Sequence, residues 1–563
     1  MSFLTIHERR DIPFWQQVWD AAGLEDALHH PKETQQQKLL DILAHNEETA
    51  FGKTYHFSRL RSVSDFQQAV PIQTDQELQP YIQRSLSPEQ PPQLTEQRAV
   101  MYALSGGAGG APRMLPITPS FINDYLAPAQ MHAARLLNDH ALQHPNGKLL
   151  LWASNDLAGT VAEGIPYGAL SGFLALRQPA IIKRFSALPA ELARITDLEQ
   201  KYYLALRLAL EQDISALLIP NTDVLCLLAD DMERWADDLI EDIRAGSLNR
   251  RYRLSPSMRS LIIPMLKPNP RRADELEEQR RGNHGALLPS LAWPRLRAIS
   301  CWKGGALTLA AGRLARLYGP VPVRDHGYIS TEVWGSVPLS DDGQGSPLAV
   351  SSAFFEFIPE QQLDHPASAA TYTCDQIEVG RSYGLLVTTT AGLYRFLTSD
   401  VLRVVDFYHD TPVVAFERHR EHLCSLSGER LTEPQVTAAL ALASRNAGIE
   451  LTQATVAPRE MPAGYLVTVE CAAATPAETL RLLAEEFERA LQAQNERYAQ
   501  RRQKGLLASP ALRLAVPGAF ARYRQEQVSA GVPDSQLVLP HLSQDRRLSD
   551  ALTVATEINS QRS

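Results

Sequence analysis

The sequence has few cysteines and no long hydrophobic run. Its apolar stretches fall short of the roughly 18 residues that a membrane-spanning helix needs, so we expect no membrane partner. The first residues, MSFLTIHERRDIPFW, are interrupted by charges before a signal-peptide core can form, which predicts a cytoplasmic enzyme. The cysteines are far apart, form no CxxC or Cys/His spacing, and are expected to be buried thiols in a reducing compartment: Cys226, Cys301, Cys374, Cys424 and Cys471.

The sequence also lacks an excess of basic charge. Lys and Arg number 55 against 64 Asp and Glu, a formal net charge of −9, which argues against nucleic acid as a ligand. Hydrophobic residues make up 44% and charged residues 21%, the proportions of an ordinary folded protein. We find no internal repeat and no low-complexity tract.

A chain of 563 residues exceeds the size of one hydrophobic core, so a large and a smaller domain are expected. Apolar runs that read as strands alternate with helical stretches, which predicts an α/β fold with a sheet covered by helices. The predicted strands span 148–154, 215–221, 297–302 and 322–330, and the predicted helices span Thr118–Asn138, 187–212, 222–246 and 306–318.

Short strands follow from Ser351, and a new mixed unit begins near residue 430 with a helix over 433–446. The predicted domains are residues 1–420, residues 421–545 and a flexible tail over 546–563. The other predicted elements of these parts are strands at 351–358, 382–390, 401–407, 412–418, 451–457 and 464–471 and a long helix at 475–503.

A glycine-rich segment, SGGAGGAPR at 105–113, is a candidate phosphate-binding loop. Ser105 can add a hydroxyl and Arg113 a positive charge, but no Gly-Lys-Ser/Thr follows, so this is not a Walker A loop. The loop either leads toward the helix that Thr118 caps, or connects two strands, because residues 114–117 intervene. The glycines whose backbone amides can approach a phosphate are Gly106, Gly107, Gly109 and Gly110.

Two further segments complete an ordered set: YISTE at 328–332 and LYRFLTSD at 393–400. In this order and at these separations the three segments resemble the nucleotide-handling motifs of acyl-adenylate-forming enzymes, specifically the auxin-responsive Gretchen Hagen family of acid-amido synthetases. The resemblance extends from AFGKTYHF near residue 50 to Asp545. It implies a large N-terminal α/β domain with β-barrel elements, a small mobile C-terminal α/β domain, and a nucleotide site between them.

The resemblance also implies roles for individual residues. Glu332 would hold Mg²⁺ and act in catalysis, Asp400 would accept hydrogen bonds from the ribose of ATP, and Arg418 would be a catalytic arginine at the domain hinge. Arg113 would be the catalytic cation of the glycine-rich loop. Core packing for Tyr328, solvent exposure for Glu332 and a surface salt bridge for Arg418 are the alternatives. The remaining residues expected to bind the nucleotide are Ser105, the four loop glycines, Tyr328, Ser330 and Thr331.

Several positions depart from the family pattern. Gly107 and Ala108 replace hydroxyl residues, Arg113 replaces a lysine, and Ser399 stands where the family has glycine. In SAGVPDSQLVLPHLSQD, residues 529–545, Val538 takes the place of the lysine that reaches the carboxylate and α-phosphate, and His541 that of an arginine. Losing one such donor costs about 10²–10³ in rate.

Two functions are compatible with this pattern. The first is an ATP- and Mg²⁺-dependent ligase that joins a small carboxylic acid to an amine or amino acid through an acyl-adenylate, with weakened or atypical adenylation. The second is a family member that no longer adenylates: a ligand-binding protein, or an acyl transferase using a pre-activated donor in a biosynthetic pathway. A structural partner protein is a third possibility, and either a monomer or a dimer is expected.

Overall fold

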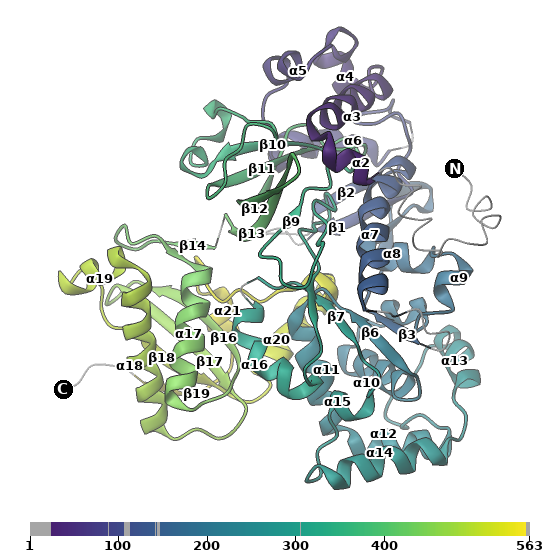
Figure 1. The fold of residues 1–563 in the computed structure, drawn as a ribbon, viewed down its shortest axis with the longest axis vertical. Helices are drawn as coiled ribbons and strands as arrows, with labels where there is room; N and C mark the ends of the chain where they lie inside the picture. The colour runs from purple at the N-terminus through teal and green to yellow at the C-terminus, as the bar shows by residue number, and fades with distance from the viewer. Residues whose placement is uncertain are drawn as a thin grey trace. The chain divides into compact units, whose positions relative to one another are not determined.

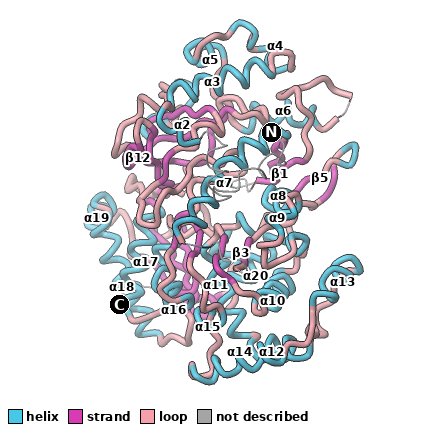
Figure 2. Tube along the Cα trace, turned by 45° about the vertical axis from the view of Figure 1, so that its right-hand side comes forward, coloured by secondary structure: helices cyan, strands magenta, loops and turns pink. Residues whose placement is uncertain are grey.

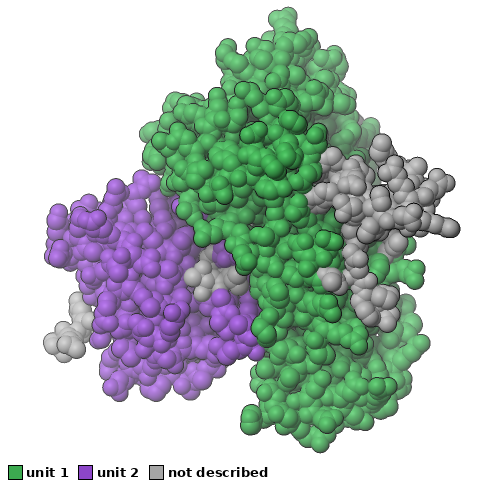
Figure 3. Space-filling view, in the orientation of Figure 1, with its two compact units in different colours: residues 1–220, 227–301, 317–416 green, residues 221–226, 302–316, 417–563 purple. Residues whose placement is uncertain are grey.

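The computed structural model describes residues 24–87, 89–105, 113–140, 142, 147–304, 306–420 and 422–558. The chain forms two compact units, coloured separately in Figure 3. Unit 1 comprises residues 1–220, 227–301 and 317–416, and unit 2 comprises residues 221–226, 302–316 and 417–563. Among the described residues, no helix is both long and apolar enough to cross a membrane.

A parallel sheet in unit 1 confirms the predicted α/β class. Its order is β3 (Lys148–Leu151), β6 (Ile214–Leu218), β7 (Ala298–Cys301) and β8 (Val323–Asp325), and neighbouring strands are parallel. Burial on both faces explains why these strands read as apolar runs. The strand predicted over 322–330 ends at Asp325, so YISTE follows the strand in a loop.

Helices between these strands differ in detail from the prediction. The predicted helix over 187–212 shortens to α10 (Leu198–Ala209), and the one over 222–246 is divided at Trp235 into α11 (Thr222–Arg234) and α12 (Ala236–Ala245). Gly246 ends α12 with φ of 68°, and a Cβ there would lie 2.3 Å from the nitrogen of Pro268. Figure 2 shows α12 alongside α14 (Pro270–Gly282).

The glycine-rich loop joins two antiparallel strands, β1 (Met101–Ser105) and β2 (Arg113–Ile117), so the hairpin is the correct alternative. Ser105 and Arg113 are cross-strand partners. The sheet order is β2, β1, β5 (Pro166–Gly168) and β4 (Gly159–Thr160). Thr118 caps α7 (Pro119–Asp139) as predicted, by accepting a hydrogen bond from the amide of Phe121.

A five-stranded sheet lies almost wholly in unit 1 (Figure 1). Its order is β10 (Phe354–Pro359), β11 (Ser382–Thr388), β12 (Phe396–Tyr408), β13 (Thr411–His419) and β9 (Ser346–Pro347). One face packs on the N-terminal helices, and the side chain of Gln35 donates to the backbone oxygen of Ala353 at 2.6 Å. The other helices of unit 1 are α2 (Leu24–His29), α3 (Pro31–His45), α4 (Ala50–Thr54), α5 (Val63–Ala69), α6 (Asp75–Ser85), α8 (Leu170–Leu176), α9 (Ala180–Lys183), α13 (Pro256–Ile262) and α15 (Pro289–Ala292).

Unit 2 has a four-stranded sheet with order β16 (Leu451–Arg459), β17 (Gly464–Cys471), β18 (Ala511–Ala515) and β19 (Val554–Ile558). Apolar side chains of α17 (Glu433–Ala447) and α18 (Ala477–Gln494) share one core with these strands. The other elements of unit 2 are α16 (Ala306–Tyr318), which continues into unit 1, α19 (Glu496–Gln503), α20 (Ala519–Ser529), α21 (Arg547–Ala551), β14 (Leu423–Cys424) and β15 (Leu431–Thr432).

The predicted flexible tail is wrong for residues 546–558. These residues form α21 and β19, and β19 pairs antiparallel with β18. Leu548, Leu552 and Ile558 are buried at 5%, 4% and 8% exposure. The polar composition of the segment hid these apolar anchors, whose burial outweighs the cost of ordering the chain.

Candidate functional site

The site is built around Arg113, the first residue of β2. Its Nε donates to Oγ of Ser105 at 3.0 Å, Nη1 to Oδ2 of Asp75 at 2.6 Å, and Nη2 to Oε1 of Glu332 at 3.4 Å. The guanidinium carbon lies 5.9 Å from the ring centroid of Phe396. One side chain therefore connects the glycine-rich hairpin, α6, the YISTE loop and the start of β12.

Glu332 is buried, with 6% of its surface exposed, so exposure to solvent is excluded for this residue. Its backbone amide donates to Oγ of Ser330 at 3.2 Å, which fixes the turn of the loop. Burial raises the pKa of Glu332, and the charge of Arg113 opposes that rise. Burial thus favours the neutral form of this carboxyl group, and the Arg113 guanidinium favours its charged form.

Tyr328 and Asp400 form the second half of the site. The phenol of Tyr328 donates to Oδ2 of Asp400 at 2.7 Å, and the two residues are 5% and 6% exposed. Burial, reinforced by Asp400, raises the pKa of Tyr328 well above its ordinary value, so the phenol remains a donor. The ring also belongs to the hydrophobic core, so Tyr328 serves both packing and the polar cluster.

Asp400 lies inside β12 rather than after a turn. The β11–β12 register shifts there: Gly384 faces Val401, whereas Leu386 faces Leu397, so three residues of β12 oppose one of β11. A β-bulge of this kind redirects a side chain from the regular alternation of a strand. Ser399, expected to disturb a glycine turn, is part of this bulge.

The cluster carries more negative than positive charge. Burial disfavours the charge of Arg113, but Glu332, Asp75 and Asp400 together raise its pKa. Three carboxylates thus act on one guanidinium, and Asp75 alone among them is largely solvated, with 52% side-chain exposure. Buried carboxylate oxygens with excess negative charge are the donor set that suits Mg²⁺, so the residues present fit that ion.

The predicted site residues fall into three groups. Ser105, Arg113, Tyr328, Ser330, Glu332 and Asp400 come together in unit 1, and Thr331 is buried beside them in the chain at 6% exposure. Arg418 belongs to unit 2, is 4% exposed rather than on the surface, and donates Nη1 to the oxygen of His419 at 3.3 Å. Gly106, Gly107, Gly109 and Gly110 lie outside the described residues.

Sequence reasoning missed Asp75, Tyr125 and Gly335. Asp75 is the first residue of α6 and follows the N-cap Thr74, whose capping box includes Glu77. This pattern predicts the start of a helix and does not indicate a binding residue. Tyr125 donates from its hydroxyl to the oxygen of Ser330 at 3.2 Å. A Cβ on Gly335 would lie 2.5 Å from Cδ1 of Tyr328, so the ring position requires glycine there.

A buried imidazole pair lies beside this cluster. Nε2 of His132 is 2.8 Å from Oγ of Ser300, which is 2.7 Å from Nδ1 of His326. Trp334 contacts both imidazoles and, edge-on, the ring of Tyr125. Burial lowers the pKa of His326 to about 4 and, together with His326, holds that of His132 well below its usual value, so both rings are neutral at pH 7.

The segment that resembles the family's closing sequence, residues 529–545, holds a part-exposed valine and a buried histidine at the two positions where the family has basic residues. Val538 is 38% exposed, and its amide donates to the oxygen of Gln536 at 3.0 Å. His541 is 5% exposed, its amide donates to Oε1 of Glu433 at 2.7 Å, and its Nδ1 lies 2.8 Å from the oxygen of Ala454. Its imidazole therefore anchors the segment to β16.

A cavity of about 250 Å³ lies in another part of unit 1. Trp152 and Lys201 line it, and Nζ of Lys201 donates to the oxygen of Ala153 at 2.8 Å while lying 4.7 Å from the Trp152 ring centroid. It shares no lining residue with the Arg113 cluster.

Comparison with known families gives three consecutive matches. The GH3 family N-terminal domain matches residues 21–323, the GH3 family central domain residues 346–419, and the GH3 family C-terminal domain residues 434–547. Together they span most of the chain.

Individual relatives agree with these matches. A probable indole-3-acetic acid-amido synthetase GH3.12 of Oryza sativa subsp. japonica is 25% identical over 92% of each chain. The jasmonoyl–L-amino acid synthetase JAR4 of Nicotiana attenuata is 25% identical over 73% of each chain. The solved AtGH3.15 acyl acid amido synthetase in complex with 2,4-DB aligns with a TM-score of 0.83 and 20% identity, covering 97% of this chain and 98% of that one, which shows a shared fold.

Proposed function

The chain belongs to the GH3 family, and on that premise we propose that it is an ATP-dependent ligase joining a small carboxylic acid to an amine or amino acid. One observation carries the proposal: Arg113, Glu332, Tyr328 and Asp400, drawn from three separate segments, form one buried charged cluster. The relatives named as acid-amido synthetases support the same reaction class.

Joining an unactivated carboxylate to an amine requires a leaving group on the acid. The carboxylate oxygen attacks the α-phosphorus of ATP and pyrophosphate leaves, giving an acyl-adenylate. The amine then attacks the acyl carbon, its proton is lost, and AMP departs. Catalysis of both steps depends on positioning and on cations placed where negative charge develops.

We assign roles to the residues by their chemistry. Asp400 accepts hydrogen bonds from the ribose hydroxyls, and the Tyr328 phenol holds its carboxylate in place. Glu332 would hold Mg²⁺, which when bound neutralises phosphate charge. Arg113 and Ser105 contact the phosphates at the end of the glycine-rich hairpin, whose four glycines would supply backbone amides.

We further propose that adenylation is weak. Valine at 538 offers no cation to the developing charge, and His541 is engaged in holding its own segment. The alternative is a member that no longer adenylates: a ligand-binding protein, or an acyl transferase that receives a pre-activated acyl group. Val538 is the observation that favours this alternative.

The acid is proposed to lie beside Tyr125 and Trp334, whose rings offer apolar contact next to Glu332. His132 adds one polar atom, because its buried Nδ1 has no hydrogen-bond partner within the described residues. His132→Phe should therefore change KM for the acid by more than it changes KM for ATP. Equal changes in both constants would contradict this placement.

The proposal is tested by acid-dependent exchange of pyrophosphate into ATP, measured with Mg²⁺ across a panel of carboxylic acids. The ligase predicts slow exchange that needs a particular acid. Nucleotide binding is measured separately as a thermal shift with ATP or AMP. A thermal shift without exchange supports the non-adenylating alternative. The absence of both signals would contradict a nucleotide site.

We propose a reducing, cytoplasmic location, because the five cysteines are far apart in the sequence, show no CxxC spacing, and four of them are buried. A monomer or a dimer is proposed for the active form. Light scattering on the purified chain tests this, and a larger assembly would contradict it.

A further inference from the structure

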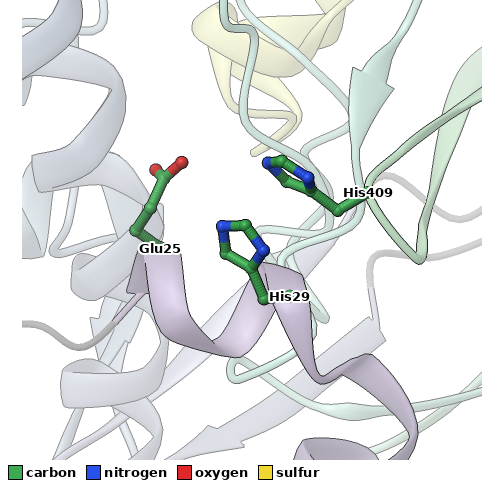
Figure 4. A group of neighbouring side chains, drawn as sticks. All are labelled: Glu25, His29 and His409. Atoms are coloured by element: carbon green, nitrogen blue, oxygen red, sulfur yellow. The ribbon is translucent and has the colours of Figure 1, made fainter.

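A second polar cluster lies in unit 1, where α2 meets the turn between β12 and β13 (Figure 4). Glu25 and His29 are four residues apart on α2, so both side chains lie on one face of the helix. His409 occupies the β12–β13 turn with φ of 51°. One ligand atom from each of the three residues lies within 4.8 Å of the other two.

We propose that Glu25, His29 and His409 bind one divalent transition-metal ion. Two imidazoles and one carboxylate are the donor set of open zinc sites, in which water completes the coordination. Imidazole favours zinc, cobalt, nickel and copper over Mg²⁺, which prefers oxygen alone. The site is therefore distinct in chemistry from the carboxylate cluster around Glu332.

The two elements are held together without a metal. Oγ1 of Thr411 donates to the oxygen of Leu28 at 2.7 Å, and the rings of His29 and His409 stack with centroids 3.7 Å apart. The hydroxyl of Tyr408 donates to Oε1 of Glu25 at 2.8 Å. The ligands are thus brought near one another before binding, and less ordering is required when the metal enters.

Binding requires a small local adjustment. A metal about 2.1 Å from each donor needs donor separations of at most about 4.2 Å, and the three atoms already lie within 4.8 Å of one another. The two imidazole rings are stacked, so they must turn for one nitrogen of each to face the same ion. Both histidines are exposed, and their side chains can rotate without repacking a core. Arg135, whose Nη2 lies 3.4 Å from Oε2 of Glu25, opposes the cation and would turn away.

Tyr408 has the position of an outer residue that orients a ligand. Such a partner typically contributes 10- to 100-fold to metal affinity, and for the half-buried Glu25 carboxylate we expect about 10-fold. The metal would fasten α2 to the β12–β13 turn, and it would stabilise unit 1 because the unfolded chain does not bring these residues together.

The test is titration of the full-length chain with Zn²⁺ by calorimetry, followed by thermal melts with and without the ion. One equivalent should bind, and the melting temperature should rise. His409→Asn keeps a residue that tolerates positive φ at this turn. His409→Asn and His29→Gln, each made alone, should bind Zn²⁺ at least about 10-fold more weakly than wild type. His30→Ala, which removes the neighbouring exposed histidine, is the matched control and should bind as the wild type does.

Tyr408→Phe distinguishes an oriented site from loose histidine binding, and should weaken Zn²⁺ by about 10-fold while leaving the metal-free melting temperature nearly unchanged. Equal affinity in wild type, His29→Gln and His409→Asn would overturn the proposal. So would a loss of affinity in His30→Ala equal to that in His29→Gln, or full competition by Mg²⁺. Metal-free melts of each variant confirm that it is folded.

Discussion

The Arg113 cluster and the segment around Val538 differ in what they retain of acid-activating chemistry. In unit 1, Glu332 and Asp400 are buried, bonded and opposed by a guanidinium. In unit 2, the position proposed for a catalytic lysine holds a part-exposed valine, and the imidazole near it is used for anchoring. Under the proposed function, the groups assigned to nucleotide binding are therefore present in this chain, whereas the lysine assigned to acid activation is replaced by Val538.

The largest expected effect comes from removing the buried Glu332 carboxylate. Glu332→Gln should reduce acid-dependent pyrophosphate exchange by about 10²–10³, because one preorganised charge is lost. Asp75→Asn is the matched control, since it also contacts Arg113 but is half exposed. Equal losses in the two variants would show that Glu332 has no special place.

Removing the Arg113 guanidinium should destabilise unit 1. Arg113→Met leaves Glu332 buried and unpaired, and breaking a buried pair costs about 3 kcal/mol. Urea unfolding measures the loss. Arg113→Lys keeps the charge and should recover most of it, and a Met variant as stable as wild type would contradict the pairing in the structure.

A smaller effect is expected from breaking the hydrogen bond between Tyr328 and Asp400. Tyr328→Phe removes a hydrogen bond to a carboxylate, which contributes about 1.5–3 kcal/mol, and should weaken the thermal shift caused by AMP. Gly335→Ala should have the same effect indirectly, because its methyl group would displace the Tyr328 ring. Val538→Ala serves as the neutral control and should leave AMP binding unchanged.

The two units should lose stability over different pH ranges as the pH falls. Burial depresses the pKa of His326 from 6.5 to about 4. Its contribution to the free energy of unfolding is therefore complete above pH 6.5 and is lost as the pH falls toward 4. Burial alone would raise the pKa of Glu433, but His422 and His541 lower it from 4.5 to about 2, so its contribution persists until the pH falls below 4.5.

Hydrogen exchange measured by mass spectrometry checks this order. Peptides covering β7, which contains Ser300, should lose protection between pH 6.5 and 4, before peptides covering the start of α17. Simultaneous loss in both regions would contradict the separation. In His326→Gln the loss in β7 should depend less on pH.

The sequence predicted the family and the α/β class because long segments with fixed chemistry, such as YISTE, identify both, and these two predictions are confirmed. It could not predict the β-bulge that turns Asp400, because bulges depend on the register of two strands. Asp75 and Tyr125 were equally hidden, since they approach the cluster only through tertiary packing. Weak adenylation, inferred from Val538, stays a prediction about function.

Restoring the cation tests the central claim most directly. In Val538→Lys, acid-dependent pyrophosphate exchange should rise by about 10²–10³ over wild type, because one donor is returned to a site otherwise competent for adenylation. Val538→Met, of similar length without charge, should leave exchange at the wild-type rate. No gain in the lysine variant, with AMP binding intact, would contradict the account.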